Sequence, residues 1–214
     1  MGNSLITEII IIVLTGCAPT CIWFLFFLRE DIHPEPKRVL WYTFMIGGLV
    51  SIPVLALQII FRDLVQNLAY ASFLLIGGLA LIEEVFKFCA AYWAVHKNPA
   101  VDEPVDAMIY LIAAGLGFAT IENVFIAINA YDANITLALT TLLSTLTLRL
   151  IGATFLHTLT SALIGYQWAR GKIMKTLRSH LILGLLSATI IHAIFNALVS
   201  RYQEQNLQIG RAHV

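Results

Sequence analysis

Ionisable and amide side chains lie inside long apolar stretches of this sequence, where such groups are costly. Five of the thirteen acidic and thirteen basic residues lie there with two histidines and two asparagines, namely Glu83, Glu84, Lys87, Glu122 and Arg149, His157 and His192, and Asn123 and Asn196. On insertion scales, a charge at the centre of a membrane helix costs about 2.5–3.5 kcal/mol. Because such groups face the interior of a bundle and mark reaction or ion pathways, these residues are the candidates for a functional site.

The spacing of these residues indicates which of them can act together. Lys87 follows Glu83 by four residues and Glu84 by three, so it can pair with either carboxylate on one helix face. Two adjacent carboxylates in a low dielectric do not both ionise easily unless a cation or metal intervenes. His192 and Asn196 are four apart, so an imidazole and an amide can address the same small volume. The pattern predicts proton transfer or divalent-metal chemistry.

The depth of the candidates in their spans brings them to a common level. Counted from the nearest basic joint at about 1.5 Å per residue, Glu84 lies about 17 Å deep and Glu122 about 25 Å. His157 and His192 each lie about 18 Å deep by the same count. Four helices are therefore expected to bring carboxylates and imidazoles together near the midplane of a bilayer.

The composition indicates the kind of protein that positions these groups. The chain has 214 residues, of which 59% are hydrophobic and 12% are charged. An ordinary soluble domain is about half apolar and about a quarter charged. These values exclude a solvated globule, a disordered chain and a nucleic-acid partner, and they make the lipid bilayer the expected surroundings.

Six apolar stretches are long enough to cross a membrane, which takes about 20 residues. They lie near residues 5–28, 39–61, 68–95, 105–130, 145–169 and 180–200. We expect an all-α, polytopic transmembrane helical bundle with a buried polar site, forming one domain over 1–214 with a retained first helix and a polar tail at 201–214. The apolar run at 135–144 is either an interfacial helix or an extension of the fifth span.

Basic residues predict the orientation of the bundle in a cell membrane. The joints at 29–38, 96–104 and 170–179 together carry eight Lys and Arg residues, and the opposite side carries three. Because basic residues concentrate in cytoplasmic loops, both termini are expected on the non-cytoplasmic side.

The candidate residues lie in four longer segments, EEVFKF (83–88), DEPVDAMIYLIAAGLGFATIEN (102–123), RLIGATFLHTLTSALIGY (149–166) and HAIFN (192–196). These segments resemble the PrsW family of membrane-embedded proteases. APTCIWFLFFLREDIHPEPKRV (18–39) is similar to the first helix and following loop of that family. The resemblance thus runs from about residue 18 to 196. The family is distantly related to the CAAX prenyl endopeptidases and to bacteriocin-immunity-type proteins.

The resemblance implies an intramembrane endopeptidase acting on a membrane-anchored protein substrate. The best-known members of the family make the first cut in an anti-sigma factor, in a signalling cascade. The matching motifs are Glu83-Glu84-x-x-Lys87, Phe118-x-x-x-Glu122-Asn123, His157 and His192-x-x-x-Asn196. Glu122 stands where the prenyl-protease relatives carry His, and some relatives carry Asp where this chain has Asn196.

Two versions of the peptidase stay open. In a metal-free glutamate protease the catalytic residues are Glu83, Glu84, Glu122, His157, His192 and Asn196. There a glutamate activates water, His192 and Asn196 stabilise the oxyanion, and His157 protonates or orients. In a metal-dependent version, zinc or a related divalent ion is held by a set drawn from Glu83, Glu84, Glu122, His157 and His192. The supporting residues are Lys87, Asn123, Arg149 and Phe118.

Other classes of protein offer further alternatives. Buried Glu, Lys and His also line transporters and proton relays, although the sequence has no obvious inverted repeat. An immunity-like binding protein would keep the motifs without turnover. The same residues also have structural roles to weigh, since Arg149 can reach the membrane interface and Asn123 and Asn196 can bond between helices.

Overall fold

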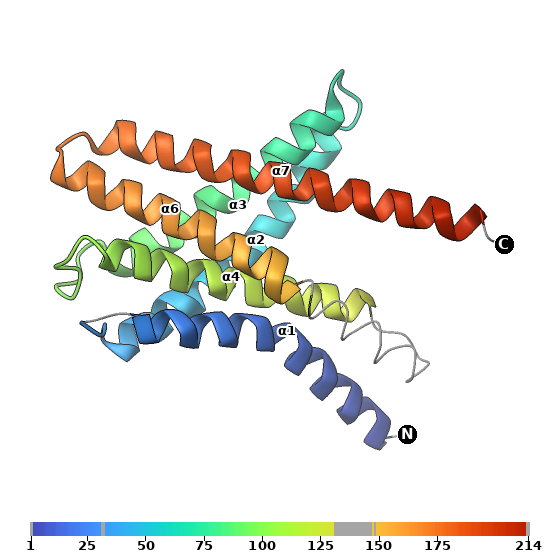
Figure 1. Cartoon of the computed structure of the whole chain (residues 1–214), viewed down its shortest axis with the longest axis horizontal. Helices are drawn as coiled ribbons and strands as arrows, with labels where there is room; N and C mark the ends of the chain where they lie inside the picture. Colours follow the sequence, from blue (N-terminus) through green and yellow to red (C-terminus); the bar gives the residue numbers. More distant parts are fainter. Residues whose placement is uncertain (1, 31–32, 131–146, 148, 213–214) are drawn as a thin grey trace.

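The computed structural model describes residues 2–30, 33–130, 147 and 149–212. These residues form six α-helices and one π-helical turn, and no strand occurs among them (Figure 1). The elements are α1 (Gly2–Glu30), α2 (Lys37–Val65), α3 (Ala71–Val95), α4 (Asp106–Ala130), η1 (Arg149–Ala153), α6 (Thr154–Ile173) and α7 (Leu177–Ala212). The predicted all-α membrane bundle is confirmed.

The six predicted spans correspond to the six α-helices, with differences at their ends. α7 continues as a helix to Ala212, so the polar residues beyond 200 extend the helix as far as the structure describes them. The fifth span contains the π-helical turn η1 immediately before α6. The run at 135–144 lies outside the described residues.

Helix length and composition fit a membrane. Four segments are long and apolar enough to cross one, namely Ile12–Arg29, Lys37–Val65, Asp106–Ile128 and Leu177–Tyr202. Of these, α4 is the most enclosed, with 61% of its segment buried against 22% for the segments of α2 and α7. α4 therefore forms the centre of the bundle, and α2 and α7 present apolar side chains to the surroundings.

Close backbone contacts hold α4 against its neighbours. A Cβ atom added to Gly47 of α2 would meet the carbonyl of Ala114, and one added to Gly117 of α4 would meet the carbonyl of Phe44. A Cβ atom at Gly165 of α6 would lie 2.6 Å from the Cα atom of Met108. Small residues thus let α2 and α6 approach α4 closely, which fixes the helices that carry the polar residues.

The chain alternates between the two ends of the bundle. Figure 1 shows the α1–α2, α3–α4 and α6–α7 connections at one end, and both described termini at the other. This agrees with the predicted grouping of the three basic joints. The side that faces the cytoplasm stays a prediction from the basic residues.

Candidate active site

Four helices bring the candidate residues to one place in the bundle. α3 carries Glu83, Glu84 and Lys87, α4 carries Glu122, α6 carries His157, and α7 carries His192. The three α3 residues are all buried, as expected for side chains three and four residues apart on one helix face. The predicted meeting of carboxylates and imidazoles is found in the fold.

One part of the cluster is sealed, and we call Glu84, Lys87 and His192 the closed half. The Glu84 and Lys87 side chains are 0% exposed, and the Lys87 Nζ atom donates to Glu84 Oε1 at 2.7 Å. The Nδ1 atom of His192 lies 2.6 Å from the same oxygen. Because an ionised carboxylate only accepts, Nδ1 of His192 carries the hydrogen, which makes Nε2 the nitrogen that can bind a metal ion.

Glu83 lies next to the closed half with its two oxygens in different surroundings. Its Oε1 atom accepts a hydrogen bond of 2.8 Å from Nε2 of Gln58 on α2. Its Oε2 atom lies 3.6 Å from Nε2 of His192 and is buried without a hydrogen bond to any described residue. An unpartnered carboxylate oxygen and an imidazole nitrogen therefore face each other, and a cation between them would give this buried oxygen a partner.

The other part of the cluster is accessible, and we call Glu122, Arg149 and His157 the open half. The Oε2 atom of Glu122 lies 2.7 Å from Nη2 of Arg149 and 2.9 Å from Nε2 of His157. The Glu122 side chain is 32% exposed. Arg149 also donates to Asn123 Oδ1, and the Asn123 amide donates to Thr154 Oγ1 at 3.2 Å. Arg149 begins the π-helical turn η1, an irregularity that occurs frequently at functional sites.

Lys87 joins the two halves. Its Nζ atom lies 3.3 Å from Nδ1 of His157 and 3.3 Å from Oγ1 of Thr160. The same atom lies 5.9 Å from the centre of the Phe118 ring, which itself is 5.9 Å from the His157 ring. One buried ammonium group thus balances the charge of Glu84 and contacts the imidazole of the open half.

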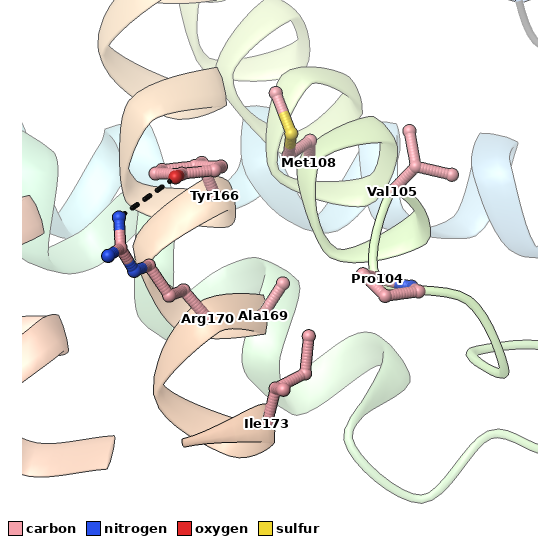
Figure 2. Close-up of a pocket in the computed structure, with 7 residues that line it drawn as sticks. All are labelled: Pro104, Val105, Met108, Tyr166, Ala169, Arg170 and Ile173. Carbon is pink, nitrogen blue, oxygen red and sulfur yellow. Dashed lines mark hydrogen bonds between the residues drawn. The ribbon is translucent and has the colours of Figure 1, made fainter. Parts of the chain in front are cut away.

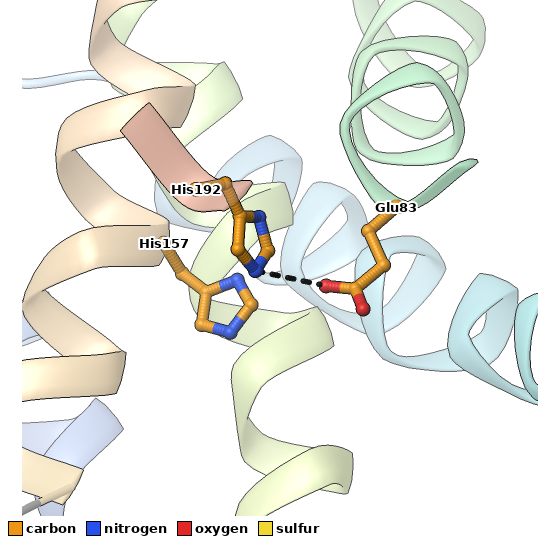
Figure 3. A group of neighbouring side chains, drawn as sticks. All are labelled: Glu83, His157 and His192. Carbon is orange, nitrogen blue, oxygen red and sulfur yellow. Dashed lines mark ion pairs between the residues drawn. The ribbon is translucent and has the colours of Figure 1, made fainter. Parts of the chain in front are cut away.

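Three donor groups of the cluster fit a metal ion. Glu83, His157 and His192 each offer one donor atom, and these atoms all lie within 4.8 Å of one another. Figure 3 shows the two imidazoles and the carboxylate gathered from three helices. Two imidazoles and a carboxylate are a donor set of catalytic zinc sites. Each ring also bonds a second carboxylate, Glu84 or Glu122, as metal-binding imidazoles usually do.

Some predicted residues lie at the edge of this arrangement. Asn196 is partly buried and forms no hydrogen bond with any described residue of the cluster, so its role as an oxyanion donor stays a prediction. Sequence reasoning missed Gln58 and Thr160. Gln58 had a visible signal, because it is the only polar residue in the apolar stretch 52–61. Thr160 had none, since threonine is common in membrane helices.

A separate pocket of about 420 Å³ lies between the start of α4 and the end of α6 (Figure 2). Its lining is mostly apolar and consists of Pro104, Val105, Met108, Tyr166, Ala169, Arg170 and Ile173. Arg170 donates a hydrogen bond of 3.1 Å to the hydroxyl of Tyr166 beside it. None of the candidate site residues lines this pocket.

Comparison with known proteins decides the family. The model of the PrsW family intramembrane metalloproteases matches residues 35–213. The chain belongs to the PrsW family. The matched region includes every residue of the closed and open halves. The part of the chain that identifies the family is therefore also the part that forms the cluster.

Curated relatives carry the same family name. The chain is similar to Protease PrsW of Geobacillus kaustophilus, with 28% identity over 150 residues, which are 69% of this chain and 60% of that protein. It is 30% identical to Protease PrsW of Shouchella clausii over 52% of each chain. It is 33% identical to Protease PrsW of Clostridioides difficile over 42% of this chain and 38% of that protein. The matches thus cover between 38% and 60% of the length of these relatives. No solved structure matches the chain.

Proposed function

We propose that this protein is a membrane-embedded endopeptidase that uses a divalent metal ion, such as zinc, to hydrolyse membrane-anchored protein substrates. The observation that carries the proposal is the gathering of Glu83, His157 and His192, whose donor atoms lie within 4.8 Å of one another. The family description, intramembrane metalloprotease, supports the same activity.

In this proposal three residues bind the metal ion, and the buried residues beside them support the ligands. Glu83, His157 and His192 would hold the ion, which supplies a Lewis acid that polarises the scissile carbonyl. Glu84 is fully buried and bonded to His192, so it orients that ring and has no access to a substrate. Lys87 offsets the charge of Glu84 within the sealed interior.

Proton transfer falls to the open half. Glu122 is the most exposed carboxylate of the cluster, so it is the group that can accept a proton from the attacking water. That proton then passes to the nitrogen that leaves when the peptide C–N bond breaks. Arg149 lies 2.7 Å from Glu122 and brings positive charge to the place where the oxyanion develops.

The substrate is proposed at two levels of detail. A buried site in a helical bundle receives a segment that itself enters or borders the bilayer, so the substrate is a membrane-anchored protein. A membrane-bound anti-sigma factor is the specific substrate that the family resemblance suggests. Its cleavage would start a signalling cascade.

The test uses the full chain in proteoliposomes. Proteomics of membranes containing wild type or Glu83→Gln first names a substrate, as a protein left uncut in the variant. That substrate is then incubated with wild type, Glu83→Gln and the control Glu103→Gln, an exposed carboxylate of the α3–α4 connection. We expect chelator to stop cleavage by wild type and zinc to restore it, Glu83→Gln to be inactive, and Glu103→Gln to match wild type.

Three results would overturn the proposal. Full cleavage by Glu83→Gln would exclude the ligand set, and ion flux without cleavage would favour a transporter. Cleavage that persists in chelator while Glu83→Gln is inactive would favour the metal-free glutamate protease.

A further inference from the structure

Gln58 is a polar residue in an otherwise apolar part of α2. It lies in the stretch 52–61, where both of its following neighbours, Ile59 and Ile60, are exposed to the surroundings of the bundle. An amide without a hydrogen-bond partner is energetically costly in hydrocarbon. A polar side chain at this place therefore requires a partner within the protein.

The partner of Gln58 is the carboxylate of Glu83. Nε2 of Gln58 donates to Oε1 of Glu83 at 2.8 Å, which leaves Oε2 as the oxygen turned toward His192 at 3.6 Å. A carboxylate that turns about its last bond would exchange the two oxygens or move both away. One held oxygen fixes the direction of the other.

Resting on the metal site proposed above, we infer that Gln58 is a positioning residue for it. Its amide holds Oε1 of Glu83 so that Oε2 faces the imidazoles of His157 and His192. α2 carries no other residue of the cluster, so this hydrogen bond links the helix that runs obliquely past α4 in Figure 1 to the site. Partners of this kind beside metal ligands affect metal affinity 10–100-fold.

A purely structural role for Gln58 predicts a different outcome. Hydrogen bonds between membrane helices also stabilise bundles without touching a site. The chain offers a matched control in Thr20 of α1, whose hydroxyl accepts a hydrogen bond of 2.8 Å from Thr120 of α4. Thr20→Val removes an interhelical hydrogen bond that touches none of the proposed ligands.

The experiment measures zinc affinity of the purified full-length protein by competition with a chromophoric chelator, and thermal unfolding without zinc. The variants are Gln58→Met, which keeps the length and removes the donor, Gln58→Asn, whose amide is one methylene shorter, Thr20→Val and Glu83→Gln. We expect both Gln58 variants to bind zinc 10–100-fold more weakly than wild type, and Thr20→Val to bind it equally. If Gln58→Met does not fold, Gln58→Asn gives the same measurement.

The outcomes separate this inference from the proposed function. Unchanged zinc affinity in the Gln58 variants, with affinity lost in Glu83→Gln, would overturn the inference and leave the metal site standing. Unchanged affinity in Glu83→Gln would overturn the metal site itself. An equal loss in Thr20→Val and Gln58→Met would assign the effect to general stability and overturn the positioning role.

Discussion

The two halves of the cluster contain the same carboxylate–imidazole pair in opposite surroundings. In the closed half Glu84 contacts His192 at 2.6 Å, and in the open half Glu122 contacts His157 at 2.9 Å. Yet the Glu84 side chain is 0% exposed and the Glu122 side chain is 32% exposed. The pair alone therefore does not define a role. The exposure of the carboxylate distinguishes the two halves, because of these two glutamates only Glu122 is open to water or a substrate.

The largest expected effect is in the open half. Glu122→Gln removes the group that is proposed to accept the proton of the attacking water, so we expect cleavage to fall about 10²–10⁴-fold. Zinc affinity should change far less, because Glu122 is a partner of His157 and not one of the three proposed ligands. Cleavage rates and zinc competition on the same preparation measure both. An unchanged cleavage rate in Glu122→Gln would contradict the assignment of proton transfer to the open half.

The next effect concerns the stability of the closed half. Lys87→Met leaves Glu84 buried without its cation, and breaking a buried pair typically costs about 3–5 kcal/mol. Thermal unfolding without zinc should therefore begin at a clearly lower temperature than in wild type. Added zinc should recover part of the loss, because a bound cation replaces the missing positive charge. Lys172→Met, an exposed lysine over the Trp168 ring, is the control and should unfold like wild type.

Glu84→Gln tests whether the closed half acts through His192. The amide keeps the shape of the side chain but weakens its bond to Nδ1 of His192, so zinc affinity should fall about 10–100-fold. At saturating zinc the cleavage rate should return toward that of wild type, since the Glu84 side chain is fully buried. A rate that stays low at saturating zinc would show that Glu84 does more than orient the ring.

The smallest effect is expected at the edge of the open half. Arg149→Lys keeps the charge but loses the fork that reaches both Glu122 and Asn123, which amounts to one charged hydrogen bond. We expect the cleavage rate to fall about tenfold, with zinc affinity unchanged. Initial rates at several substrate concentrations would locate the loss in kcat. A loss confined to KM would assign Arg149 to substrate binding.

The fold was predictable because membrane thickness sets the length of apolar runs. The meeting of Glu83, Glu84, Glu122, His157 and His192 also followed from their depth alone. The depth of a residue in the membrane does not say which way its helix is rotated about its own axis, however. Glu83 and Glu84 are adjacent, and only the packing of α7 decides that Glu84 receives the short bond to His192.

Other parts of the site lay outside what the sequence could give. Asn196 lies four residues after His192 and is expected on the same helix face. In the fold, however, His192 is buried and bonded to Glu84, whereas Asn196 is only partly buried. The π-helical turn at Arg149 changes the rotation of the residues after it, and nothing in its sequence indicates the extra residue per turn. Gln58 stands out as a polar residue in an apolar stretch, but its contact with Glu83 depends on which face of α2 meets α3.

His192 lies on α7, which follows every other described helix along the chain. During synthesis, a chain that has inserted only as far as α6 contains Glu83, Glu84, Glu122 and His157 but lacks the imidazole that contacts both adjacent glutamates. The three proposed metal ligands therefore come together only after α7 has entered the bilayer. The order of insertion thus sets the moment at which the proposed site is assembled.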